Sequence, residues 1–234
     1  MNKRFAKGRL SIAAVGLVAA ILAAAAVAAT RATGENAYIV HNLVSDVPGV
    51  ADHVDPQLVN AWGLTSTAAS PWWVADNHSN FSTLYQADGT KVQLDVQVHN
   101  APTGAVANPN PGTNFVVHED GRSGSSRFIF DTEEGKILGW SPSVALDHAV
   151  VAVDRSDVHA IYKGLALGTI GTADFLYAAD FHNARVDVFD DGFNLVTNPG
   201  SFVDPKLPAG YAPFGIANVD GQIFVSYAKQ DSAG

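Results

Sequence analysis

The sequence predicts an all-β fold made of repeated four-stranded antiparallel units, and two sets of markers support it. Three times, an aspartate that closes a short apolar run is followed nine residues later by an aromatic residue. The pairs are Asp76 with Tyr85, Asp131 with Trp140, and Asp180 with Phe189. In step with them, four units open with a glycine before a small or branched apolar residue, at Gly63, Gly104, Gly164 and Gly215. A period of roughly 50 residues indicates stacked supersecondary units.

The N-terminal residues have the pattern of an export signal. Basic residues precede a mainly apolar run, Leu10 to Ala29, which contains the small-residue pattern Ala26-Val27-Ala28. We therefore expect residues 1–29 to be a signal peptide or, because the run is also long enough to span a bilayer, an uncleaved membrane anchor. A linker would follow over residues 30–36. In either case the remainder is expected to be exported, to the periplasm, the cell surface or the extracellular space.

The charge of the remaining chain limits its partners. Four of the 14 Lys and Arg residues lie in the apolar segment or just before it, so ten remain against 23 Asp and Glu, a formal charge of −13. Nucleic acid is therefore excluded as a partner, and a membrane is expected only through an uncleaved N-terminal segment. An unknown small molecule, glycan or protein remains. Because there is no cysteine, neither disulfides nor thiol chemistry contribute.

Residues 37–234 are predicted to form the repeat domain, with units that start near residues 60, 102, 162 and 212. Tyr38 to Ser45 is predicted to be a strand without a unit of its own. The similar runs Val54 to Leu58 and Val203 to Leu207 contain a proline, which suits a loop leading into a unit. Ser143 to Val153 has only weak helical periodicity and is predicted to be a loop followed by a strand.

The third unit illustrates the expected sheet. Its four short segments of strand-forming residues are separated by turn residues and run over Lys163–Ile170, Phe175–Asp180, Ala184–Asp190 and Phe193–Asn198. The first two are apolar throughout, which predicts burial on both faces. Stacking such sheets about an axis leaves only short protected edges, as in a β-propeller.

The turns follow from local chemistry. Gly192 and the pair Asp88-Gly89 are expected to supply the positive φ of tight hairpins. Asp76 and Asp180 are expected to accept backbone N–H groups two residues on, in Asx turns.

The chain resembles NHL-type propeller repeats in two segments, Leu176–Val196 and Phe214–Ala228. Three other segments, Leu43–Leu64, Ser126–Pro142 and Tyr211–Asp231, are similar to an exported bacterial family of six-bladed propellers, some of which carry a PEP-type C-terminal sorting signal. The resemblance implies a six-bladed whole of which about three and a half blades are present here, so a fragment is expected. It implies no established activity.

A search for catalytic motifs finds none. The nearest string to a G-x-S-x-G elbow, Gly121 to Ser125, has one glycine out of place and is interpreted as a flexible linker. The eight histidines show no spacing typical of a zinc site. A calcium site in the central channel, as in propeller lactonases, is an alternative that would use oxygen ligands. The nearest metal candidates are Asp76, Asn77, Asp131 and Asp180.

Residues just before each opening glycine are better placed to bind a ligand, because the loop into an innermost strand rims the channel. These candidates are Asn60, Trp62, Thr103, Lys163, Tyr211 and Phe214. Aromatic residues on a concave mouth can stack on a sugar or hold a peptide. Trp62 and Phe214 can equally serve to pack adjacent blades.

The sequence therefore favours an exported, non-catalytic binding or scaffold module at the cell envelope or outside the cell, with no cofactor other than calcium. A calcium-dependent lactonase-like hydrolase and a purely structural surface protein are the alternatives.

Overall fold

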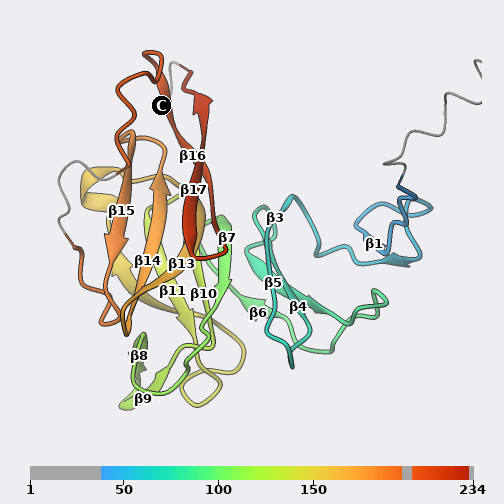
Figure 1. Cartoon of the computed structure of the whole chain (residues 1–234). Coiled ribbons are helices and arrows are strands. Elements are labelled where there is room, and N and C mark those ends of the chain that lie inside the picture. Colours follow the sequence, from blue (N-terminus) through green and yellow to red (C-terminus); the bar gives the residue numbers. More distant parts are fainter. Residues whose placement is uncertain (1–37, 197–201, 232–234) are drawn as a thin grey trace, which may run out of the picture. The chain divides into compact units, whose positions relative to one another are not determined.

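The computed structural model describes residues 38–196 and 202–231, and apart from one short 3-10 helix all its regular elements are β-strands. The chain divides into two compact units, residues 1–41 and 42–234, and the sheets belong to the second. Four antiparallel sheets follow one another along the sequence and are called blades 1 to 4 (Figure 1). The predicted signal or anchor over residues 1–29 and the linker over 30–36 lie outside the described residues.

Blades 1 and 2 are complete four-stranded sheets. Blade 1 has the order β3 (Ala61–Thr65), β4 (Trp72–Asp76), β5 (Phe81–Tyr85) and β6 (Val96–Gln97). Blade 2 has the order β7 (Pro102–Ala107), β10 (Phe128–Thr132), β11 (Lys136–Trp140) and β12 (Val150–Asp154). The segment Ser143–Val153 is a loop followed by β12, as predicted, and the 3-10 helix η1 (Ser156–Val158) follows.

Blades 3 and 4 contain fewer described strands. Blade 3 consists of β13 (Tyr162–Ile170), β14 (Ala173–Asp180) and β15 (Arg185–Phe189), and blade 4 of β16 (Tyr211–Val219) and β17 (Gln222–Lys229). The predicted fourth strand of blade 3, Phe193–Asn198, is reduced to one bridge between Leu195 and Phe189. Its last two residues lie outside the described part of the chain.

A hairpin of β8 (Val116–Glu119) and β9 (Arg122–Ser125) is inserted between the first two strands of blade 2. The interpretation of Gly121 to Ser125 as a flexible linker was therefore wrong. Asp120 and Gly121 both have positive φ, 50° and 74°, which is the turn that an Asp-Gly pair favours in a two-residue hairpin.

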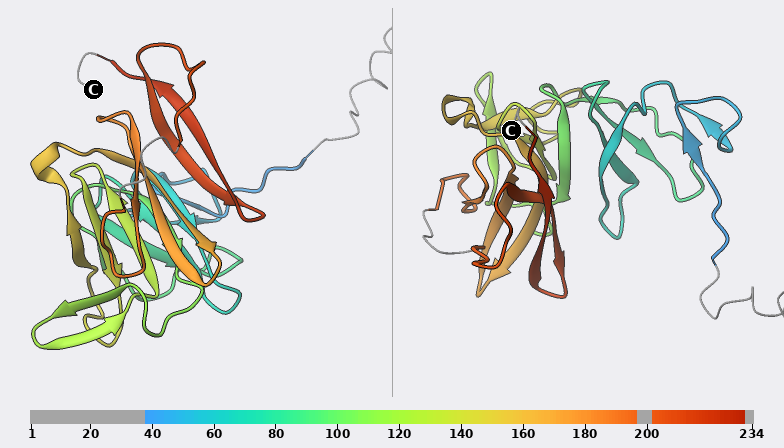
Figure 2. Two further views of the ribbon diagram at one scale, coloured as in Figure 1. Left: turned by 60° about the vertical axis from the view of Figure 1, so that its left-hand side comes forward. Right: turned by 90° about the horizontal axis from the view of Figure 1, so that it is seen from above.

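The innermost strands β3, β7, β13 and β16 contact one another in that order. Figure 2 shows the β16–β17 hairpin (red) beside the sheet of blade 3 (orange). Three apolar clusters fill the spaces between successive blades. Trp73 of blade 1 stacks on Phe128 of blade 2 at 4.1 Å, and Ile129 of blade 2 and Leu176 of blade 3 share the next cluster. The chain is therefore an all-β, partial propeller.

Two predictions about the N-terminal part and the hairpins need correction. Only Val44–Ser45 of the predicted strand Tyr38–Ser45 is a strand, β1, and it pairs in parallel with β2 (His53–Val54). Gly192 is not the positive-φ residue of its hairpin, because Phe193 takes that conformation with φ 63°. The expected role of Gly89, with φ 85°, is confirmed.

The nine-residue spacing also misaligned one aspartate. Asp76 and Asp180 face the start of the inner strand, opposite Ala61 and Tyr162, but in blade 2 that position belongs to Thr132, opposite Pro102. The β10–β11 turn is one residue shorter than its equivalents, so the aromatic marker stays in place while Asp131 moves one residue back along its strand.

No helix among the described residues has the length and apolar character needed to cross a membrane.

Candidate functional site

Each of the four inner strands carries a β-bulge at the same place, just at its opening glycine. In blade 1, Trp62 and Gly63 together face the single residue Ala75, because Ala61 pairs with Asp76 and Leu64 with Val74. The equivalent bulges are Thr103-Gly104, Lys163-Gly164 and Phe214-Gly215. A bulge bends the strand and redirects a side chain. The repeated glycine marker therefore reflects a repeated interruption of the hydrogen-bond ladder between the first and second strands of each blade.

The glycines at these bulges allow the inner strands to approach closely. A Cβ on Gly63 would lie 2.6 Å from the backbone nitrogen of Ala105 and 2.6 Å from the carbonyl oxygen of Thr103. No real Cβ tolerates backbone atoms at that distance, so only glycine fits here. The same contact is looser at Gly164, where the nearest atom, the carbonyl oxygen of Phe214, would be 3.2 Å away.

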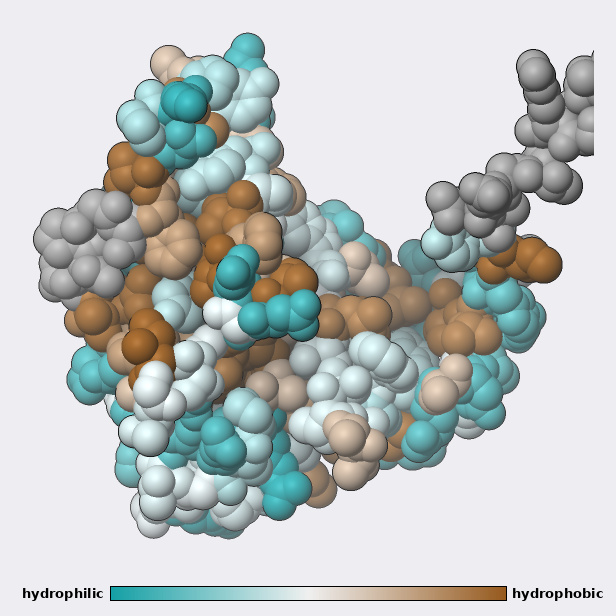
Figure 3. Space-filling model, in the orientation of Figure 1, coloured by the Kyte–Doolittle hydropathy of each residue, from teal (hydrophilic) through white to brown (hydrophobic). Residues whose placement is uncertain are grey.

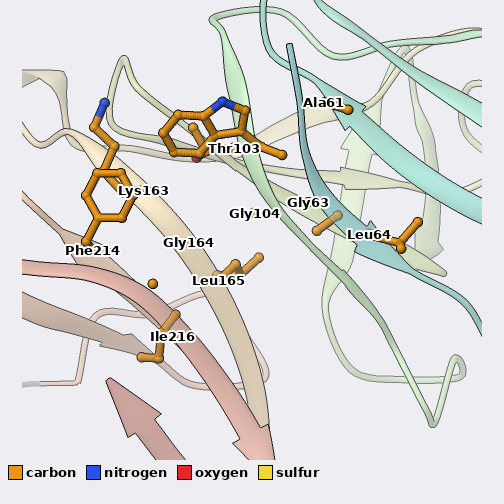
Figure 4. Close-up of a pocket in the computed structure, with 13 residues that line it drawn as sticks. Ala61, Gly63, Leu64, Thr103, Gly104, Lys163, Gly164, Leu165, Phe214 and Ile216 are labelled. Atoms are coloured by element: carbon orange, nitrogen blue, oxygen red, sulfur yellow. The ribbon is translucent and has the colours of Figure 1, made fainter. Parts of the chain in front are cut away.

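The bulges surround a pocket of about 420 Å³, which we call the inner-strand pocket (Figure 4). It is lined by the bulge residues of all four blades and by one apolar residue after each bulge, namely Leu64, Ala105, Leu165 and Ile216, together with Ala61. Figure 4 shows Lys163 and Phe214 on one side of it, with Leu165 and Ile216 near Gly164.

Aromatic rings of the first and the last blade meet at this pocket. The ring centroids of Trp62 and Phe214 are 5.6 Å apart, and Phe181 stands edge-on to Phe214 at 5.5 Å. The ammonium group of Lys163 lies 5.3 Å from the centre of the Trp62 ring, a cation–π distance. Both Trp62 and Phe214 are only partly buried, so part of this aromatic surface faces solvent.

A chain of polar contacts continues from Lys163 across three blades. Its ammonium group is paired with Glu133, whose other carboxylate oxygen accepts a hydrogen bond of 3.1 Å from the Asn77 amide. The Asn77 oxygen in turn accepts a hydrogen bond of 3.0 Å from Asn60. Burial opposes ionisation of Glu133, but hydrogen bonds from Lys163 and Asn77 outweigh it and lower its pKa. The pocket thus has an ion pair beside an aromatic pair.

The residue opposite each bulge differs between blades. It is Asp131 in blade 2 and Ser226 in blade 4, and both accept a hydrogen bond from the N–H group of the bulge glycine. Asp131 Oδ1 also accepts a hydrogen bond of 2.8 Å from Thr103 Oγ1, while its second oxygen, Oδ2, is buried without a protein partner. Burial is the main cause that raises the pKa of Asp131 to about 6, against the hydrogen bonds from Thr103 and Gly104.

Four of the six predicted binding residues line the inner-strand pocket. These are Trp62, Thr103, Lys163 and Phe214. Asn60 does not line it, but joins it through Asn77. Tyr211 also lies outside the lining, at the start of β16 opposite Lys229.

The four metal candidates do not come together as a ligand set. Asp76 accepts hydrogen bonds from the backbone and hydroxyl of Thr83, at 3.1 and 2.7 Å. The expected Asx turn of Asp76 is therefore wrong. Asp180 accepts hydrogen bonds within its turn from Asn183, which is three residues on and not two as predicted, and also from the N–H group of Ile161.

Asn77 belongs to the polar chain, and Asp131 supports the blade 2 bulge. Within residues 38–196 and 202–231, no group of three or more His, Asp or Glu residues is arranged to hold a metal ion.

Sequence reasoning missed Glu133 and Phe181, although a signal for them was present. Asn77, Glu133 and Phe181 occupy the same position in three blades, directly after the second strand. All three contact the bulge residues or one another at this pocket. The misplacement of Asp131 by one residue concealed this equivalence in blade 2.

The comparisons with known proteins agree with the fold. No family model matches the chain. It is 29% identical over 206 residues to uncharacterized protein L690 of Acanthamoeba polyphaga mimivirus, a match that covers 82% of this chain and 52% of that protein. Uncharacterized protein R648 of the same virus is 28% identical over 205 residues, with 82% and 49% covered. The chain thus spans about half the length of these curated relatives.

Among solved structures, virginiamycin B lyase from Staphylococcus aureus is similar, with a TM-score of 0.50 and 14% identity over 75% of this chain and 54% of that chain. At this identity the likeness concerns the fold alone, and it identifies the chain as β-propeller-like.

Proposed function

We propose that the protein is an exported, non-catalytic propeller module that binds a glycan at the inner-strand pocket. The observation that carries the proposal is the convergence of Trp62, Phe214 and Lys163, from three different blades, on one solvent-accessible pocket. A sugar ring presents an apolar C–H face and a rim of hydroxyl groups. Aromatic rings suit the first, and charged or hydroxyl side chains suit the second.

The polar partners for such a ligand lie beside the aromatic rings. Lys163 lines the pocket as a donor, and Glu133, which is paired with it, is an acceptor next to the pocket. Because Lys163 and Glu133 neutralise each other, the pocket suits a neutral ligand better than an ion. A protein partner with an exposed aromatic or apolar turn is the second kind of occupant that this chemistry allows.

Export is the second part of the proposal and rests on the sequence of residues 1–29. Their basic start, apolar run and small-residue pattern support removal by a signal peptidase or retention as an anchor. The NHL-type repeat pattern and a six-bladed whole belong to the same proposal. In that setting the module would act in the periplasm, at the cell surface or outside the cell.

The binding proposal is tested by screening the purified chain on an array of microbial and plant glycans, then titrating a soluble oligosaccharide from any positive group by calorimetry. W62A and F214A should each weaken binding at least tenfold, because each removes half of the stacking surface. I170A is the control, since Ile170 is exposed and lies outside the pocket. Binding that W62A and F214A leave unchanged, or no binding by the folded chain, would contradict the proposal.

The calcium-dependent hydrolase has no comparable support. Its candidate ligands Asp76, Asp131 and Asp180 lie in three separate blades, each hydrogen-bonded within its own surroundings. Calcium binding is measured directly by the change in melting temperature on adding millimolar calcium to the chain, because a bound ion stabilises the folded state.

A further inference from the structure

Two hollows lie beside the inner-strand pocket, one between blades 1 and 2 and one between blades 2 and 3. The blade 1–2 hollow has a volume of about 640 Å³ and the blade 2–3 hollow about 630 Å³. Each is bounded on both sides by blades that the structure describes. Both are lined by the turn after a second strand and by the connection into the next inner strand. They therefore open at the end of the blades where the inner strands begin.

Histidines stand at equivalent positions in the two hollows. His78 and His182 are each the second residue after the second strand of their blade, and His99 and His159 each lie three residues before an inner strand. His78 and His99 line the blade 1–2 hollow, and His159 and His182 line the blade 2–3 hollow. In blade 2 the position of His78 and His182 is taken by Glu134, which lines both hollows. All five residues are exposed, so each hollow offers a ligand two imidazole rings and a carboxylate.

The four imidazole rings have hydrogen-bonding capacity to spare. The rings of His159 and His182 stand edge to face with their centroids 6.4 Å apart, and no group in residues 38–196 or 202–231 hydrogen-bonds to any of the four rings. A neutral imidazole has one donor and one acceptor nitrogen, as a sugar hydroxyl group is both donor and acceptor. Since no three His, Asp or Glu residues of the described chain are arranged to hold a metal ion, a ligand rich in hydroxyl groups suits these rings better.

The β10–β11 turn joins both hollows to the inner-strand pocket. Glu133 lines the blade 2–3 hollow and is paired with Lys163, which lines the pocket. Asn77 lines the blade 1–2 hollow and donates its 3.1 Å hydrogen bond to the same Glu133. The pocket and the two hollows thus adjoin one another around Glu133 and Glu134. A ligand that contacts all three must be longer than a single sugar unit.

We propose that the glycan is an oligosaccharide of several units, with one unit in the inner-strand pocket and further units in the two hollows. This inference rests on the proposed function. Trp62 and Phe214 stack on the first unit, the imidazole rings hydrogen-bond to hydroxyl groups of the others, and Glu134 accepts hydrogen bonds from units in both hollows. Figure 3 shows hydrophobic residues (brown) next to hydrophilic ones (teal) on the surface, a mixture that matches the C–H faces and hydroxyl groups of a sugar chain.

The test is the dependence of affinity on chain length. Oligosaccharides of one, two, four and six units, taken from the glycan that the array identifies, are titrated into the purified chain by calorimetry. Six units should bind about tenfold or more tightly than one unit, because the added units gain hydrogen bonds in the hollows. Equal affinity at all lengths would overturn this inference and leave glycan binding at the inner-strand pocket intact. A chain that binds no glycan would overturn both.

H78A and H182A locate the added contacts, one in each hollow. Each should weaken the binding of six units about three- to tenfold, the loss expected for one or two hydrogen bonds, and leave the binding of one unit unchanged. E134A should cause a larger loss, because Glu134 lines both hollows. H118A is the matched control, since His118 is an exposed histidine of the β8–β9 hairpin outside both hollows. Thermal melts of all variants establish that they are folded.

W62A separates this inference from the proposed function. It should weaken binding at every length, because every ligand places a unit on the Trp62 ring. Six-unit binding that H78A and H182A leave unchanged, or that H118A weakens equally, would overturn the assignment of the hollows. Long ligands that lose affinity in H78A and H182A but not in W62A would instead contradict binding at the inner-strand pocket.

Discussion

The buried carboxyl group of Asp131 makes the stability of the protein depend on pH in a direction opposite to that of an ordinary surface aspartate. Its pKa is raised from 3.8 to about 6, chiefly by burial. The folded state therefore holds the proton more tightly than the unfolded state between these two values. As pH rises through this interval, the free energy of unfolding must fall. The unfolded state loses its proton readily, whereas the folded state must ionise a carboxyl group that is buried away from water.

The size of the effect follows from the two pKa values. Since one pKa unit corresponds to about 1.36 kcal/mol, the gap between 3.8 and about 6 amounts to about 3 kcal/mol. In D131N the side chain keeps an oxygen that can accept the N–H group of Gly104, but it no longer titrates. The new amide NH2 group replaces the unpartnered Oδ2 and lowers the free energy of unfolding by about 1–3 kcal/mol. This loss does not vary with pH.

The assay is urea unfolding of the parent chain and D131N, followed by tryptophan fluorescence from about pH 4 to pH 7.5. The stability of the parent relative to D131N should fall by about 2–3 kcal/mol over this range. D154N is the control, because hydrogen bonds from Ser156 and Lys136 lower the pKa of Asp154 to about 2 and leave it ionised throughout. Parallel curves for the parent and D131N, or a difference of opposite sign, would refute the reasoning.

Three further predictions concern other contacts. G63A should lower the free energy of unfolding by more than about 3 kcal/mol, whereas G164A should cost clearly less, as measured by urea unfolding; equal costs would show that the inner strands are not in close contact. Y85F should cost about 1–3 kcal/mol, because Asp55 loses a 2.6 Å hydrogen bond, and a neutral result by thermal unfolding would argue against that bond. Partial burial disfavours the charged form of His148, but its bonds to Asp147 and Glu119 outweigh this and raise its pKa. Protection of the β8–β9 hairpin from hydrogen exchange should thus be greatest below about pH 6.5 and fall as pH rises through the higher folded pKa, and H148Q should abolish this dependence.

The fold was largely predictable because its signals are local and repeated. A glycine opens the inner strand of every unit, and at Gly63 and Gly104 a Cβ would collide with the backbone of the next inner strand. Strand and turn residues placed most strands to within a few positions. The reason for the glycines, a bulge in each inner strand, was not visible, because a bulge depends on the pairing with a neighbouring strand.

The errors arose where spacing in sequence and position in space differ. The shorter turn of blade 2 moved Asp131 out of register with Asp76 and Asp180, and this hid the equivalence of Glu133 with Asn77. The segment Tyr38–Ser45 is rich in strand-forming residues, but only Val44 and Ser45 pair with another strand. Strand pairing is decided by tertiary contacts, which strand propensity does not report.

Four of the six predicted binding residues line one pocket because the bulge fixes where the residue before each opening glycine lies. The two that do not, Asn60 and Tyr211, stand earlier in their strands or loops, where no shared backbone feature directs them. Glu133, which pairs with Lys163, was missed because the shorter turn of blade 2 concealed its equivalence with Asn77.

The bulges also have a consequence for the surface of the pocket. Each described blade contributes one side chain to the pocket from the residue before its bulge glycine, while Gly63 and Gly104 leave room for the backbone of the next inner strand. Trp62 and Phe214 present partly exposed rings at these positions, whereas Thr103 donates a hydrogen bond to the backbone carbonyl of Tyr162 in the next blade. A change at Trp62 or Phe214 therefore alters the surface of the pocket without altering the glycines that keep the inner strands close.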